Sequence, residues 1–424
     1  MSSDTDTCAK KEIKIGRKII EGKTKVVFAI DDPTSCNLVV LRSKDAITAF
    51  DGQRAHEMSF KGKYSTATTC GVFDLLQYCD VPTHYRYHYD ENSFVAIFCN
   101  MIPLEVVVRR IATGSFLKRH QGVKEGYRFS PLKLEFFYKD DAQHDPLVSI
   151  EQILHMKLTA GKVVIGKDEI DIMSKVALAT FEILERAWST LNCNLIDLKV
   201  EFGVSASGTL LLADVIDNDS WRLWPSGDKR LQKDKQAYRD LKQVTDQAME
   251  EIRGNYAWVA KKIDQLMKSP SCKVMIIMGS ESDREHCMKI ATTLREMHID
   301  YQLRVSSAHK STEELLSILA SYESTEIPTV FIAVAGRSNG LGPVMAGNTT
   351  IPVINCPPIG HHDDIWSSLT LPSGLGCCTS LNTDGAALMA GQILAISNHL
   401  VWGCIRGRRL KRWLHIKKAD TNSI

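Results

Sequence analysis

Residues 327–336 read IPTVFIAVAG, and residues 337–348 continue directly with RSNGLGPVMAGN. The first ten residues form a short apolar run rich in β-branched side chains, which is typical of a buried strand. The next twelve contain three glycines and a single charge, Arg337. A buried strand that ends in such a loop is typical of a parallel α/β sheet, where ligands collect at the carboxyl ends of the strands.

The residues around this stretch alternate between strand-like and helical patterns. Strands are predicted at 273–280, 299–307, 327–336 and 351–357, and helices at 283–297, 312–323 and 384–400. This alternation predicts an α/β domain with a doubly wound parallel sheet.

The preceding part of the chain has a different pattern. Strand-like runs on either side of Gly22-Lys23, at 194–204 and at 210–216 are combined with a long helix at 171–191, which indicates a mixed α+β fold. An amphipathic helix at 255–267 is followed by the short segment KSPSC. We therefore place the first domain at 1–268, a linker at 269–272 and the second domain at 273–424.

Composition limits the class of protein. The chain has 424 residues, of which 44% are apolar and 24% charged, so it has enough apolar material for two globular domains. It has no apolar stretch of the ~20 residues that a membrane span needs, and MSSDTDTCAKKEIKIG at the start is not a secretory signal. The twelve cysteines form no C-x-x-C pair. We expect a cytosolic protein that does not bind membranes, whose cysteines are reduced.

Polar residues follow three of the strands predicted in the second domain. MGSESD (278–283) offers backbone N–H groups and hydroxyls suited to a phosphate, although serine and aspartate here can equally cap a helix. In SSAHK (306–310), His309 is a natural proton acceptor and Lys310 a cation for an anionic substrate. The third strand ends at the loop that begins with Arg337.

Together, MGSESD, SAHK and AGRSNGLGPVMAGNT resemble the aminoimidazole ribonucleotide (AIR) carboxylase family over nearly all of residues 272–400. The resemblance implies a flavodoxin-like domain that uses carbon dioxide directly, without biotin, ATP or metal. Another class in that family rearranges an N-carboxy substrate and usually has a different residue after the histidine. His309 would remove the C4 proton, while Lys310 and Ser338 would complete the catalytic group. The residues expected to bind AIR or its carboxylated product CAIR are Gly279, Ser280, Ser282, Asp283, Ser307, Ala308, Gly336, Arg337, Asn339 and Gly340.

Four motifs carry the chemistry of the first domain. EGKTK (21–25) places two lysines on a hairpin, which suits a polyphosphate but is not a Walker A sequence. In LIDLKVEFG (195–203), charges alternate along a strand, a pattern that on its own is typical of a solvated face. LADVIDNDSWRLW (212–224) clusters carboxylates that could hold Mg²⁺. MIPLEVVVRRIATGSFLKR (101–119) by itself indicates an amphipathic segment with a glycine turn.

In this order the four motifs resemble SAICAR synthetase, which joins L-aspartate to CAIR using ATP, over roughly residues 13–260. The fusion of the two domains resembles the bifunctional animal enzymes of de novo purine synthesis. The resemblance implies that Lys23, Lys25 and Glu105 bind ATP; that Glu201 and Asp214 bind Mg²⁺; and that Arg109, Ser115, Asp219, Ser220 and Arg222 bind CAIR. KDKQAYRDL (233–241) also matches, without an assigned role. Lys44, Lys61 and Lys63 are weaker candidates for contacts with phosphate or aspartate.

The resemblance also implies a homo-octamer. The basic segment RGRRLKRWLHIKK (406–418) could suggest nucleic acid, but residues 272–405 are acidic on balance, so we expect the segment to offset that charge rather than to bind nucleic acid. HHDD (361–364) is expected to be a solvated loop rather than a metal site.

The alternative to a bifunctional enzyme is a binding or scaffold protein that has kept the fold and lost catalysis. The presence of His309, Lys310, Glu201 and Asp214 argues against it.

Overall fold

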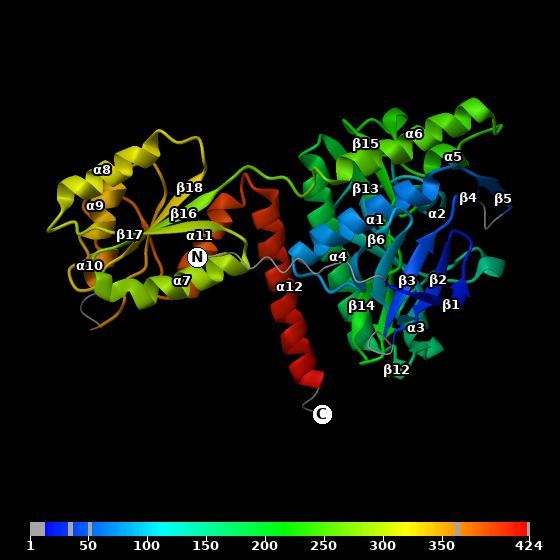
Figure 1. Ribbon diagram of the computed structural model, residues 1–424, viewed down its shortest axis with the longest axis horizontal. Helices are drawn as coiled ribbons and strands as arrows, with labels where there is room; N and C mark the ends of the chain where they lie inside the picture. The colour runs from blue at the N-terminus through cyan, green and yellow to red at the C-terminus, as the bar shows by residue number, and fades with distance from the viewer. Residues whose placement is uncertain (1–12, 33–36, 50–52, 361–364, 422–424) are drawn as a thin grey trace. The chain divides into compact units, whose positions relative to one another are not determined.

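The computed structural model describes residues 13–32, 37–49, 53–360 and 365–421 (Figure 1). HHDD therefore lies outside the described residues. Contacts divide the chain into two compact units, one formed by residues 1–267 with 410–424 and the other by residues 268–409. The domain boundaries given above stay predictions. In the described part of the chain, no helix is both long and apolar enough to cross a membrane.

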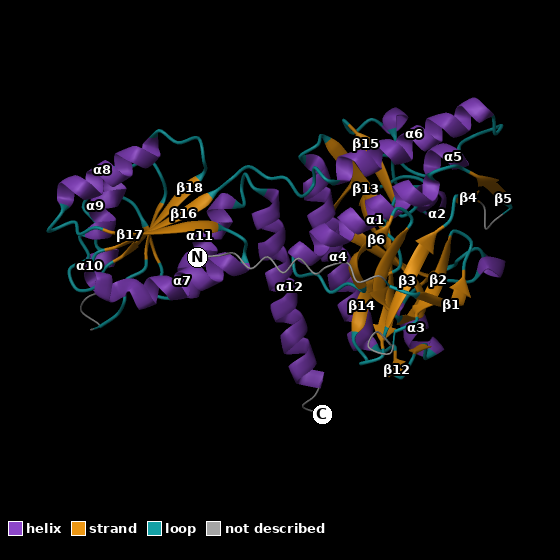
Figure 2. Ribbon diagram, in the orientation of Figure 1, coloured by secondary structure: helices purple, strands orange, loops and turns teal. Residues whose placement is uncertain are grey.

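The first unit is built on two antiparallel sheets (Figure 2). The first sheet has the order β1 (Ile15–Glu21), β2 (Lys25–Ile30), β3 (Leu38–Ser43), β7 (Ser93–Ile97), β6 (Tyr85–Asp90). The second has the order β10 (Leu147–Val148), β9 (Arg128–Tyr138), β8 (Cys99–Ile111), β13 (Cys193–Ser205), β14 (Leu210–Ala213), and β15 (Trp221–Pro225) also pairs with β13. Two short ribbons pair β4 (Ala46–Ala49) with β5 (Arg54–Glu57) and β11 (Thr159–Ala160) with β12 (Val163–Val164).

Helices complete this mixed α+β unit. They are α1 (Lys61–Tyr78), α2 (Ser115–Arg119), α3 (Ile150–Met156), α4 (Lys167–Ser189), α5 (Gln236–Arg239) and α6 (Asp246–Ile263), with 3₁₀ turns η3 (Asp141–Gln143) and η4 (Lys229–Leu231). α4 buries a stripe that includes Met173, Ala177, Phe181 and Leu184 at helical spacing and packs it against β13 and β8. The two long strands that hold motif residues are therefore supported from behind by a hydrophobic layer.

The second unit is a parallel sheet with the order β17 (Asp300–Val305), β16 (Lys273–Met278), β18 (Thr329–Val334), β19 (Val353–Asn355), β20 (Cys378–Thr379). In chain order this is 2-1-3-4-5, the flavodoxin-like arrangement. Its helices are α7 (Arg284–Glu296), α8 (Thr312–Glu323), α9 (Leu341–Gly347), α10 (Trp366–Leu369) and α11 (Thr383–Leu394), with the 3₁₀ turn η5 (Glu281–Asp283). The predicted fold classes of both domains are confirmed.

One predicted helix, 384–400, is wrong in its extent. α11 ends at Leu394, and α12 (His399–Thr421) begins after a turn. Asn398 explains the break, because its side-chain oxygen accepts the Val401 N–H at 3.0 Å, while its amide donates to the Pro270 carbonyl at 3.0 Å. An asparagine that caps the next helix ends the previous one despite continuous apolar spacing.

Candidate active sites

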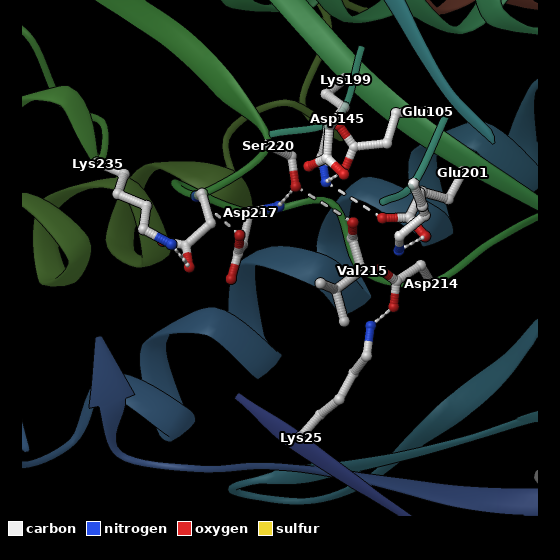
Figure 3. A network of polar contacts seen from close by, with 12 residues as sticks. Lys25, Glu105, Asp145, Lys199, Glu201, Asp214, Val215, Asp217, Ser220 and Lys235 are labelled. Carbon is white, nitrogen blue, oxygen red and sulfur yellow. Dashed lines mark hydrogen bonds and ion pairs between the residues drawn. The ribbon is translucent and has the colours of Figure 1, made fainter. Parts of the chain in front are cut away.

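A cavity of about 730 Å³ lies in the first unit and gathers side chains from all four of its motifs (Figure 3). Every residue predicted for ATP, Mg²⁺ or CAIR in this domain lines it: Lys23, Lys25, Glu105, Arg109, Ser115, Glu201, Asp214, Asp219, Ser220 and Arg222. The structure thus brings together residues that are far apart in the chain. Their roles stay predictions.

Paired strands position the carboxylates at one side of this cavity. β8 and β13 are in register with Glu105 opposite Glu201, and β13 and β14 place Glu201 opposite Ala213, the residue before Asp214. Lys199 donates to Glu105 at 2.7 Å and to Glu201 at 3.1 Å, and Lys139 donates to the other oxygen of Glu201 at 2.7 Å. The alternating charges of β13 therefore do not form a solvated face, because Glu201 is buried.

The electrostatics keep Glu201 ionised. Burial opposes its charge, but the ammonium groups of Lys199 and Lys139 outweigh burial and lower the pKa of Glu201 to about 2. Asp214, which has a positive φ of 65°, forms an ion pair with Lys25. Burial lowers the pKa of Lys25 to about 8. Two neighbouring carboxylates of this kind fit a hard cation such as Mg²⁺, which usually takes one or two protein carboxylates and completes its shell with water and phosphate. Within the described residues, no group of three or more potential ligands forms a metal site.

Two arginines form another side of the same cavity. Arg109 is buried and donates to Glu135 and to Asp197, both at 2.7 Å, and Arg222 also pairs with Asp197. Gly114 lies against Arg222 with a φ of 57°, and a Cβ there would be 2.6 Å from the guanidinium. Only glycine combines this backbone conformation with such a close approach. The geometry presents guanidinium groups next to Ser115, which suits a phosphate or carboxylate.

Asp219 has partners that the sequence did not reveal. Its carboxylate accepts from Lys61 at 3.2 Å, from Lys235 at 3.1 Å and from the hydroxyl of Tyr256. Burial would raise its pKa, but the lysines and the tyrosine lower the pKa well below the usual range. The aspartate cluster at 214–219 therefore has basic partners, which come from segments outside the motif. Lys61 is one of the weaker candidates named above, and Tyr256 belongs to the amphipathic helix predicted at 255–267.

The candidate site of the second unit lies where three neighbouring strands end. Gly279 follows β16 and donates to the Val334 carbonyl at 2.9 Å, and Ser306 follows β17 and donates to the Met278 carbonyl at 2.9 Å. These bonds continue the sheet register beyond the strands, so the three loops begin side by side. The loops contain the predicted residues Gly279, Ser280, Ser282, Asp283, Ser307, Ala308, His309, Lys310, Gly336, Arg337, Ser338, Asn339 and Gly340.

Within these loops, His309 lies directly against Gly340. A Cβ at residue 340 would be only 2.7 Å from the imidazole Nε2, so the ring can lie in this position only because residue 340 has no side chain. His309, Lys310 and Ser338 are exposed, as expected for groups that meet a substrate, whereas Ala308 packs against a hydrophobic core cluster. Ser280 accepts the Ser282 N–H at 3.3 Å and so caps the following turn, as the simpler interpretation of MGSESD predicts. Burial raises the pKa of Asp283.

The arginine loop is held by two serines that sequence reasoning missed. Arg337 has a φ of 53°, an uncommon conformation for a residue with a side chain. The Ser367 hydroxyl donates to the Arg337 carbonyl at 2.8 Å and accepts the Asn339 N–H at 2.9 Å. The buried amide of Asn339 donates to Ser368 at 2.8 Å, so this side chain already has protein partners. No local signal in the sequence connects these serines with a loop 30 residues earlier.

Comparison with known proteins gives a match over each unit. The family model for SAICAR synthetase matches residues 18–254, and the model for AIR carboxylase matches residues 273–412. The multifunctional protein ADE2 of Gallus gallus is 52% identical over 97% of this chain and 97% of its own length. The bifunctional phosphoribosylaminoimidazole carboxylase/phosphoribosylaminoimidazole succinocarboxamide synthetase of Homo sapiens is 51% identical over 96% of this chain and 97% of its length.

Solved structures also resemble the first unit. The phosphoribosylaminoimidazole-succinocarboxamide synthase of Ehrlichia chaffeensis is 29% identical with a TM-score of 0.52, over 58% of this chain and 98% of its own. A SAICAR synthetase in complex with ADP is 31% identical with a TM-score of 0.50, over the same shares of the two chains.

Proposed function

The chain belongs to the family of bifunctional AIR carboxylases/SAICAR synthetases, and we propose that its two sites catalyse successive steps with the residues described above. It is an enzyme of de novo purine biosynthesis with an AIR carboxylase unit and a SAICAR synthetase unit. The carboxylase converts AIR and carbon dioxide to CAIR, and the synthetase joins CAIR to L-aspartate with ATP to give SAICAR.

The observation that carries the assignment in the first unit is that one cavity contains three kinds of charged side chain. It contains the hairpin lysines Lys23 and Lys25, the neighbouring carboxylates Glu201 and Asp214, and the arginines beside Ser115. We assign the lysines to the phosphates of ATP, with Glu105 at the ribose, and the arginines with Asp219 and Ser220 to CAIR. The ADP complex of a 31% identical synthetase supports a nucleotide here.

In the synthetase reaction, ATP would phosphorylate the carboxylate of CAIR, and the amine of aspartate would then displace phosphate from the acyl carbon. Mg²⁺ held by Glu201 and Asp214 would neutralise phosphate charge. Lys25 and Lys199 lie beside these carboxylates, so their ammonium groups are close enough to turn toward phosphate oxygens. Arg109 is held between Glu135 and Asp197 and would orient CAIR from a fixed position.

In the carboxylase, we assign C4 deprotonation of the carboxylated AIR ring to His309. The ring lies against the backbone of Gly340, so the base faces the glycine loop. Donors of this loop and the Ser338 hydroxyl would face the new carboxylate, and one such donor typically contributes about 3 kcal/mol. Arg337 would bind the substrate phosphate. We assign no cofactor to this step.

The experiment that tests both assignments supplies AIR, bicarbonate, L-aspartate and MgATP and follows SAICAR by absorbance and mass. His309→Ala should abolish CAIR formation and leave SAICAR formation from added CAIR unchanged. Absence of SAICAR with the unaltered protein would refute catalysis and favour a scaffold role. Loss of both activities in the variant would refute independent sites.

We also propose a homo-octamer in the cytosol. Exposed apolar side chains of the second unit, Ile396 and Trp366 among them, support assembly through that unit. The described cysteines are all free thiols, in keeping with a reducing compartment. Mass photometry and fractionation of cells test these two points, and a monomer or a secreted protein would contradict them.

A further inference from the structure

The cations that line the cavity of the first unit differ in one respect. Seven of them have acidic partners within hydrogen-bonding or ion-pair distance. The pairs are Lys23 with Asp141, Lys25 with Asp214, Arg109 with Glu135 and Asp197, Lys139 with Glu201, Lys199 with Glu105 and Glu201, Arg222 with Asp197, and Lys235 with Asp219. The eighth, Arg239, has no acidic partner among the residues that the structure describes.

Arg239 lies close to the part of the cavity assigned to CAIR. It is the last residue of α5, one helical turn after Lys235, so the two side chains share a face. Lys235 donates to Asp219 at 3.1 Å. Burial and the nearby positive charges of Lys61 and Arg239 lower the pKa of Lys235, although Asp219 opposes this, so the Arg239 charge is felt inside the site.

The backbone that carries Arg239 is firmly held, although its own side chain is exposed. Asp234 accepts the Leu223 N–H at 3.1 Å and the Gln236 N–H at 2.8 Å, which fixes the start of α5. Tyr238 is buried, and its hydroxyl bonds to His56 at 2.6 Å. From a fixed position, the helix thus presents at the cavity a guanidinium that has no acidic partner among the described residues.

The proposed function requires three substrates in this cavity, and only two have assigned groups. ATP takes the hairpin lysines, and CAIR takes Arg109, Arg222 and their neighbours. L-Aspartate brings two carboxylates, and its amine must reach the activated carboxyl of CAIR. The planar fork of an arginine matches a carboxylate with two parallel hydrogen bonds.

We propose that Arg239 binds a carboxylate of L-aspartate and so forms the subsite for the third substrate of the synthetase. This rests on the proposed function of the cavity. An unpaired cation is what this subsite needs, because aspartate adds a negative charge that no other cation in the described cavity lining is free to balance.

The test uses the full-length protein and measures SAICAR synthesis from CAIR, ATP and L-aspartate. Arg239→Gln should raise the KM for aspartate about 10- to 100-fold, the loss expected for a charge-assisted bidentate pair. The KM values for CAIR and ATP should change less than about twofold. Arg239→Lys, which keeps the charge, should give an intermediate KM. Succinate, which lacks the amine, should inhibit Arg239→Gln less strongly than the parent, by about the same factor as the rise in the KM for aspartate.

The matched control is Arg230→Gln. Arg230 is also exposed, pairs with Asp228 and lies outside the cavity lining, so this variant should leave all three KM values unchanged. A higher KM for CAIR or ATP in Arg239→Gln, or an unchanged KM for aspartate, would overturn the subsite while the proposed function stands. No SAICAR from the unaltered protein would remove the proposed function and the subsite together.

Discussion

Replacement of Gly340 by alanine should move the side chain of His309 without removing it. This variant therefore tests whether catalysis depends on the position of the histidine. The new Cβ would lie 2.7 Å from His309 Nε2 and 3.0 Å from Cε1. Ordinary contact between such atoms needs about 3.5 Å, so the imidazole must move by roughly 0.8 Å. His309 is exposed, so its ring can turn away at little cost to folding.

A displacement of this size is large for catalysis. Misplacement of a reacting group by about 1 Å can cost 10²-fold in rate. We therefore expect Gly340→Ala to lower kcat for AIR carboxylation by about 10- to 100-fold, with a smaller change in the KM for AIR. The reverse reaction, in which CAIR loses carbon dioxide and is followed by its absorbance, should slow by the same factor, since both directions share a transition state.

The control is Gly376→Ala in the same unit, because a Cβ there meets no atom within 4 Å. It should leave the carboxylase rate unchanged. Both variants should retain SAICAR synthesis from CAIR and the thermal unfolding midpoint of the parent. An unaltered kcat in Gly340→Ala would refute the idea that the glycine sets the position of the base. A large fall in the unfolding midpoint would show instead that the glycine serves folding.

Three further outcomes follow. Arg109→Ala leaves the buried carboxylates of Glu135 and Asp197 with one partner fewer and should destabilise the first unit by about 3 kcal/mol in urea unfolding; a change below about 1 kcal/mol would contradict it. Burial raises the pKa of Asp234 to about 7, so between about pH 4 and 7 the unfolded chain releases a proton that the folded chain keeps, and stability falls as pH rises. Asp234→Asn should flatten this slope in pH-dependent unfolding, and an unchanged slope would refute the shift. Chelation of Mg²⁺ should stop SAICAR synthesis and spare AIR carboxylation, so a carboxylase that also fails would overturn its cofactor-free assignment.

The fold of the second unit could be predicted because its central strands β16 and β18 are continuous apolar runs separated by amphipathic helices. Such runs are buried on both faces, so local hydrophobicity decides them. The prediction failed where a single side chain decides. Asn398 turns the chain between α11 and α12 through hydrogen bonds to Val401 and Pro270, and the spacing of apolar residues does not predict such bonds.

The sites show the same limit more clearly. Glu201 and Asp214 could be proposed together because their motifs are recognisable, although only strand pairing makes them neighbours. The contacts of Lys61 and Tyr256 with Asp219 could not be predicted, since they join segments about 160 and 40 residues away. A hydroxyl at one end of an apolar ring does not alter the helical pattern that marks the ring as core.

The two sites keep their reactive groups in place by different means, and this decides how each should respond to mutation. In the first unit nearly every charged side chain at the cavity has a partner of opposite charge. When a lysine turns toward a phosphate oxygen, it leaves a carboxylate that can bind a cation, so charge balance is kept. Removal of one charge there leaves its partner uncompensated, and the effect spreads through shared carboxylates such as Asp197. In the second unit the base is positioned by close backbone approach, so shape rather than charge is critical. Replacement of a charged side chain by a neutral one of the same shape should therefore impair the synthetase most. The addition of one methyl group at residue 340 should impair only the carboxylase.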